Sequence, residues 1–103
     1  MNVQPSPESI LIEAERLVNG DRNESYGPPW VDYGRTVEIF AAITSIDLTV
    51  EQAIMFMVAM KLSRQAHLAK RDNLVDACGY LACLQATIDH KQQRRMGVHI
   101  ADV

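Results

Sequence analysis

The pattern of apolar and polar positions is most informative between Ala53 and Met60, a run of eight residues without one polar side chain. A helix that is apolar on every side is expected to be buried on most of its surface. The sequence then places Lys61, Arg64 and His67 at i, i+3 and i+6, which is roughly one stripe of the same helix. These three residues are called the basic stripe below. The segment therefore predicts a buried helix with a cationic end.

Four helices are predicted from the spacing of apolar positions and from start and stop signals. Their approximate ranges are residues 7–19, 29–44, 49–68 and 72–94. Ser6 is the predicted N-cap of the first helix, and Asn19-Gly20 is its predicted left-handed C-cap. Thr49 and Gln52 form a capping box at the start of the third helix.

The segment between the first two helices, residues 20–29, reads as a polar loop bearing glycine and proline, and it is long for a simple connection. It holds Asp21, Arg22 and Tyr26, which suit a binding site. The alternative is a surface loop whose polar groups satisfy backbone groups and helix ends.

Four helices with short connections predict an all-α fold, a small antiparallel four-helix bundle. We expect one domain over residues 1–103, with tails at residues 1–6 and 97–103. A bundle of this size buries limited area, so we also expect a homo-oligomer. Gly79 in the last helix costs about 1 kcal/mol relative to alanine. It indicates close approach by a neighbouring element or by a ligand.

Composition narrows the classes of partner. A formal net charge of −3 argues against duplex DNA, because that binding depends on basic surface. No segment approaches the ~18 to 20 uninterrupted apolar residues of a membrane span, and the first residues do not resemble a secretory signal. Cys78 and Cys83 lie about 140° apart around one predicted helix, so they are unsuited to bridging each other. Free thiols fit a cytoplasmic location.

The candidate site lies where the last two helices are expected to turn back on each other. This arrangement would bring the basic stripe to the acidic start of the final helix. It puts His67 nearest Asp72 and Arg64 near Asp76, with Lys61 one turn further along. The alternative is a network of interhelical salt bridges without a ligand.

The side chains of this site fit a phosphorylated, nucleotide-like ligand better than any other class we considered. Lysine and arginine on adjacent turns offer an anion both a point charge and a fork of donors. Aspartates can orient those cations or accept from a sugar or base, and tyrosines can stack on a ring. The candidate ligand-binding residues are Arg22, Tyr26, Lys61, Arg64, His67, Arg71, Asp72, Asp76 and Tyr80. No residue is assigned a catalytic role, and no cofactor is expected.

An Mg²⁺ site is the alternative use of the acidic residues. Asp72 and Asp76 at i, i+4 could supply half of such a site, and Glu13 or Glu15 of the first helix the rest. Zinc is not expected, because the histidines lack zinc-ligand spacing. They are His67, His90 and His99.

Two stretches, LVNGDRNESYG and KLSRQAHLAKRDNLVDACGY, resemble a family of short phage and prophage proteins of unknown function. The resemblance covers about Ile10 to Leu84. Its motif positions are Asn19, Gly20, Asp21, Arg22, Tyr26, Gly27, Lys61, Arg64, Asp72, Asp76, Gly79 and Tyr80. The Asp-x-x-x-Asp-x-x-Gly-Tyr end is similar to the second metal-binding helix of all-α nucleotide pyrophosphohydrolases. Glu13 and Glu15 do not reproduce the glutamate repeat of that superfamily.

The resemblance implies a phage-type protein acting in the cytoplasm of a host cell. By loose analogy with small oligomeric phage proteins that sequester nucleotide signals of host immunity, we expect a binder that does not hydrolyse its ligand. Two alternatives stay open. One is an Mg²⁺-dependent nucleotide pyrophosphohydrolase, and the other is an interaction protein that inhibits a host protein.

Overall fold

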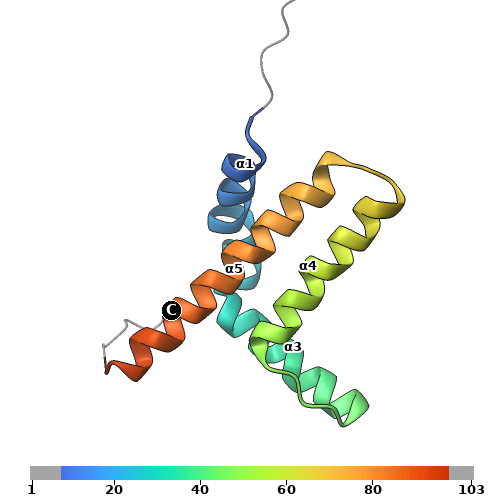
Figure 1. The fold of residues 1–103 in the computed structure, drawn as a ribbon. Coiled ribbons are helices and arrows are strands. Elements are labelled where there is room, and N and C mark those ends of the chain that lie inside the picture. Colours follow the sequence, from blue (N-terminus) through green and yellow to red (C-terminus); the bar gives the residue numbers. More distant parts are fainter. Residues whose placement is uncertain (1–7, 98–103) are drawn as a thin grey trace, which may run out of the picture.

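The computed structural model describes residues 8–97, and most of them are helical (Figure 1). The elements are α1 (Ile10–Leu17), the π-helical segment η1 (Val18–Arg22), α2 (Asn23–Tyr26), α3 (Pro29–Thr44), α4 (Val50–His67) and α5 (Arg71–Arg95). The described part of the chain contains no strand. The all-α class and the four longer helices are therefore confirmed. The predicted tails at residues 1–6 and 97–103 lie outside the described residues, except for Gly97.

Helix α5 is the central element, since it contacts α1, α3 and α4 (Figure 1). Helices α4 and α5 form an antiparallel hairpin, and α1 lies along the other side of α5. Burial on α5 falls on nearly every second residue at its start, from Asn73 through Val75 and Ala77 to Gly79. This spacing arises because neighbours cover the helix from two sides.

The ends of the hairpin are fixed by side-chain hydrogen bonds. The capping box is present, because Gln52 N donates to Thr49 Oγ1 and Thr49 N donates to Gln52 Oε1, each at 3.0 Å. In the connection between the helices, Gln65 Oε1 accepts from Lys70 N at 2.9 Å and from Asn73 Nδ2 at 3.2 Å. Asn73 is thus a buried polar residue with a satisfied side chain.

The start of α1 differs from the prediction. The predicted N-cap, Ser6, lies outside the described residues, and the helix starts only at Ile10. Its N-cap is Ser9, whose side chain accepts from Leu11 N at 3.2 Å. The capping chemistry is the one that was predicted, a serine side chain that accepts a hydrogen bond from a free backbone N–H, but Ser9 provides it.

The predicted loop at residues 20–29 is also wrong over most of its length. Gly20 has φ −101° and ψ −112°, so it kinks the helix instead of forming a left-handed C-cap. The chain continues helically through Tyr26 and turns at Gly27, whose φ of +78° favours glycine. Val18 packs closely against α5, because its Cγ2 lies only 3.3 Å from where a Cβ on Gly79 would stand. This contact with α5 is a close approach of the kind predicted at Gly79.

The core of the single chain is small. Its buried apolar residues are Ala14, Ala53, Ile54, Val75, Ala77 and Cys83. On α4 only Ala53 and Ile54 are buried, whereas Met55 is 55% and Phe56 67% exposed. The predicted burial of this helix on most sides is therefore wrong for one copy of the chain. None of the helices within residues 8–97 is long and apolar enough to cross a membrane.

Candidate functional site

One carboxylate connects three elements at the centre of the molecule. Asp76 Oδ2 lies 2.9 Å from Lys61 Nζ of α4, and Asp76 Oδ1 lies 3.3 Å from Arg22 Nη2 of η1. The Lys61 side chain is 16% exposed and that of Asp76 is 22% exposed. These pairs are more shielded from solvent and salt than surface pairs, so they hold η1, α4 and α5 together more strongly.

The predicted register of the hairpin is wrong by about one helical turn. Asp76 was expected near Arg64, but its partners are Lys61 and Arg22. The connection covers residues 68–70, one position earlier than the predicted 69–71, and α5 already begins at Arg71, so Asp76 stands level with Lys61. The prediction that the basic stripe meets an aspartate of the last helix therefore holds for one of its three cations.

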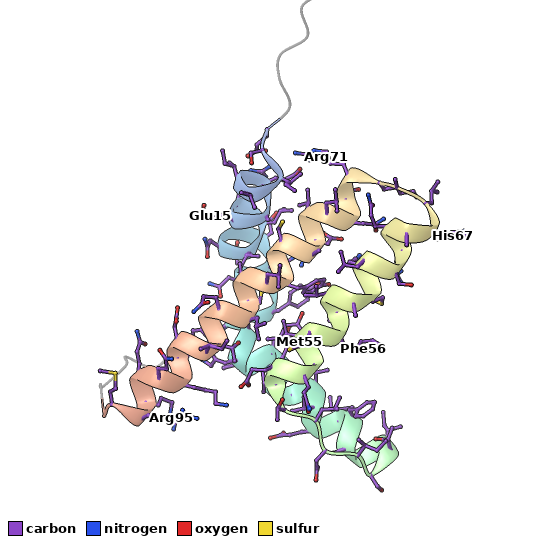
Figure 2. The ribbon with its side chains drawn as sticks, in the orientation of Figure 1. Glu15, Met55, Phe56, His67, Arg71 and Arg95 are labelled. Carbon is purple, nitrogen blue, oxygen red and sulfur yellow. The ribbon has the colours of Figure 1, made fainter. Side chains whose placement is uncertain are left out.

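Four other candidates lie away from this cluster. Arg64 and His67 are exposed, and His67 sits at the far end of α4 beside the turn (Figure 2). Asp72 is exposed and forms no ion pair with another described residue. Arg71 reaches across to α1 and pairs with Glu13 (Figure 2). The expected pairing of His67 with Asp72 is therefore replaced by a contact that ties α5 to α1.

A cavity lined by three of the predicted residues lies between η1, α2, α3 and α5, not between α4 and α5. It has a volume of about 350 Å³, and Arg22, Tyr26 and Tyr80 are among its lining residues. Asp32 and Tyr33 of α3 complete its polar wall. Three of the nine sequence-predicted residues thus meet at one cavity, although they come from three different elements.

Arg22 is held in a fixed position at this cavity. Its guanidinium carbon lies 5.5 Å from the centroid of the Tyr80 ring, and one of its nitrogens pairs with Asp76. A guanidinium carries five N–H donors in a planar fork, so donors remain for an anion in the cavity. The ring contact and the carboxylate reduce the rotamer freedom that Arg22 would lose on binding.

Tyr33 and Cys83 keep the inner wall uncharged. Burial raises the pKa of Tyr33 far above its ordinary value, and the nearby Tyr80 and Cys83 add to the shift. Burial likewise raises the pKa of the Cys83 thiol. The phenol therefore stays neutral and can donate or accept, and the thiol is a poor nucleophile.

Asp32 contributes the negative charge at the rim. Its Oδ1 lies 3.8 Å from Arg35 Nη2, which also donates to the carbonyl oxygen of Tyr26 at 3.2 Å. Arg35 thereby connects the end of α2 to α3. Sequence reasoning missed Asp32 because no local signal shows that it lines the cavity. Only the neighbouring Tyr33 and Tyr26 mark the region as aromatic.

The acidic residues considered for Mg²⁺ are not gathered. Within residues 8–97 no three His, Cys, Asp or Glu side chains stand close enough to share a metal ion. Glu13 is engaged by Arg71, and Asp76 by Lys61 and Arg22. The donor set that the sequence suggested does not fit a metal site in this arrangement.

Comparison with known proteins gives a family but no activity. A family model described as "Domain of unknown function (DUF6378)" matches residues 9–88. The Gene 55 protein of Mycobacterium phage D29 is 32% identical over 79 residues, which cover 76% of this chain and 52% of that protein. The Gene 55 protein of Mycobacterium phage L5 is 29% identical over 79 residues, covering 75% and 51%. The chain thus spans about half the length of these curated relatives, and no solved structure matches it.

Proposed function

From the cavity of this chain, which belongs to the DUF6378 family, we propose that it binds a small phosphorylated nucleotide. Membership of the family confirms the resemblance to phage proteins of unknown function. The observation that carries this proposal is the convergence of Arg22, Tyr80, Tyr26 and Asp32 on one hollow. These groups supply a phosphate ligand, two aromatic rings and an acceptor for a base or sugar.

The size of the cavity favours a mononucleotide. A volume of about 350 Å³ is at the lower end of the range of roughly 300 to 1,000 Å³ found for ligand sites. The charge of the residues that line the cavity also favours a small ligand. The charged residues that line it are one cation, Arg22, and one anion, Asp32, so the formal charges of the lining cancel. We infer a ligand of low negative charge, smaller than a nucleoside triphosphate.

The proposed roles divide the predicted residues into two groups. Arg22 holds the phosphate, and Tyr26 and Tyr80 stack on the ring. Lys61 and Asp76 position Arg22 without touching the ligand. Arg64, His67, Arg71 and Asp72 have no part in this proposed site.

We further propose that binding serves to sequester the nucleotide without hydrolysing it, as a homo-oligomer in the cytoplasm of a phage-infected cell. The phage origin of the relatives supports the setting. The uncharged inner wall and the dispersed acidic residues support binding over hydrolysis.

Calorimetric titration with nucleoside monophosphates, cyclic mononucleotides and inorganic phosphate tests the proposal. We expect Arg22→Lys to weaken binding about tenfold or more, because the ammonium keeps the charge opposite Asp76 but loses the fork. Arg16→Lys is the matched control, since Arg16 is an exposed arginine of α1 outside the cavity. Equal binding by the two variants, or no binding by the wild type, refutes the site.

Two further readouts separate the alternatives. Mass spectrometry of small molecules released from protein purified from infected cells identifies a retained nucleotide. Release of a cleaved product in the presence of Mg²⁺ would instead establish the pyrophosphohydrolase reading. A host protein that co-purifies in place of a nucleotide would favour the interaction reading.

A further inference from the structure

The prediction from the sequence and the structure of one copy differ most at the outer face of α4. This helix was predicted to be buried on most sides, but its outer face is exposed. Its members are Gln52, Met55, Phe56, Ala59, Leu62, Ser63 and Ala66, and all seven are exposed. Phe56 points away from α5 (Figure 2). The solvent-facing side of a helix ordinarily carries charged and polar residues. This face carries no charge, which is typical of a surface that packs against another helix.

A stripe along the middle of this face alternates large and small side chains. Met55, Ala59, Leu62 and Ala66 follow one another at i, i+4, i+7 and i+11, the spacing of a helix–helix seam. Met55 is 55% and Leu62 51% exposed, so both large side chains are accessible to a second molecule. Each large residue is followed by an alanine that leaves room for a side chain from outside.

We propose that the outer face of α4 binds a second copy of this chain, with the two α4 helices antiparallel. A twofold axis midway between Ala59 and Leu62 places Leu62 opposite the partner's Ala59. The same axis places Met55 opposite the partner's Ala66. Both large side chains of the stripe then meet a small one, as interdigitated packing requires. A parallel pair would set Leu62 against the partner's Leu62 and leave a void at the alanines.

The available area sets the strength of this contact. Phe56 is 67% exposed and leaves roughly 130 Å² uncovered, given about 150 to 250 Å² for a whole aromatic side chain. The whole face offers on the order of 500 Å² per copy, against about 800 Å² per partner in a standard interface. The dimer is therefore expected to exchange with monomer as the concentration changes. This inference gives a surface to the proposed homo-oligomer and does not depend on nucleotide binding.

Sedimentation velocity over a concentration series tests the surface. We expect Leu62→Glu to weaken the dimer about tenfold or more, because a carboxylate enters an apolar seam without a partner. Leu81→Glu is the matched control, since Leu81 of α5 is 50% exposed but lies outside this face. Circular dichroism establishes that both variants remain helical. A wild type that stays monomeric throughout, or equal effects of the two variants, overturns the proposal.

Mixing two variants tests the orientation. Ala59→Lys and Leu62→Glu should each dimerise poorly alone but form a heterodimer when mixed, because the lysine of one copy then faces the glutamate of the other. A parallel arrangement brings these positions no closer and gives no rescue. Absence of rescue would therefore refute the antiparallel pairing. Nucleotide titration of Leu62→Glu keeps the two proposals apart, because the proposed cavity belongs to one copy and should bind unchanged.

Discussion

Replacing Asp76 with asparagine should destabilise the fold more than any other single charge removal among the residues discussed above. The carboxylate lies 2.9 Å from Lys61 Nζ and 3.3 Å from Arg22 Nη2. At an effective dielectric constant of 20, each contact amounts to about 5 to 6 kcal/mol of gross attraction, most of which desolvation offsets. Exposed pairs contribute about 0 to 1 kcal/mol, and breaking a fully buried pair costs about 3 to 5 kcal/mol. With Asp76 22% exposed, we expect Asp76→Asn to lower the free energy of unfolding by roughly 2 kcal/mol.

Urea denaturation at neutral pH, followed by circular dichroism, measures this loss. The matched control is Asp72→Asn, one turn earlier on α5, where the carboxylate is exposed and unpaired among the described residues. The control should change the free energy of unfolding by less than about 0.5 kcal/mol. If Asp76→Asn were no more destabilising than Asp72→Asn, the central ion pairs would not hold η1 and α4 to α5, and the proposed positioning of Arg22 would fail.

The remaining predictions concern a helix cap, an ion pair and a thiol. Thr49→Ala should lower the free energy of unfolding by about 1 kcal/mol in urea denaturation, because the capping box loses one of its two bonds; an unchanged midpoint would show that the cap is dispensable. The hydrogen bond from Lys91 holds the pKa of Glu51 below its ordinary 4.5, so this carboxylate adds stability above that pH and loses it as the pH falls through the lowered value. Wild type should therefore exceed Glu51→Gln in stability at neutral pH and converge with it in acid, and a constant difference would contradict the pair. Burial raises the pKa of the Cys83 thiol. In the Cys78→Ser variant, where Cys83 is the remaining cysteine, this thiol should therefore react with a disulfide reagent more slowly than a thiol in an unfolded chain. Urea should remove this protection, and equal rates with and without urea would contradict the burial of Cys83.

Helix positions could be predicted where the signal is local. The capping box at Thr49 depends on two side chains three residues apart, and it forms as predicted. The range predicted for α3, residues 29–44, matches the structure because Pro29 starts the helix and the apolar spacing continues to its end. Local chemistry fixes such features before any tertiary contact exists.

The residues around the cavity could not be placed in the same way. Arg22 and Tyr26 were expected on a polar loop, but the chain is helical from Val18 to Tyr26 and Arg22 pairs with Asp76 of α5. Asp32 was not foreseen as a cavity residue, because its role depends on how α3 packs against α2 and α5. Side-chain type indicates what a residue can bind, but only the crossing of helices decides which residues meet.

For this protein the sequence by itself determined the all-α class, the four long helices and the supply of cations, aspartates and tyrosines. Those features follow from apolar periodicity and capping, which act over a few residues. The tertiary structure decided that Asp76 pairs with Lys61 and Arg22, and that the cavity opens beside η1. In the tertiary structure of one copy the outer face of α4 is exposed, although the sequence predicts a helix that is buried on most sides. The physical reason is that register and burial depend on contacts between distant segments, which patterns acting over a few residues do not specify.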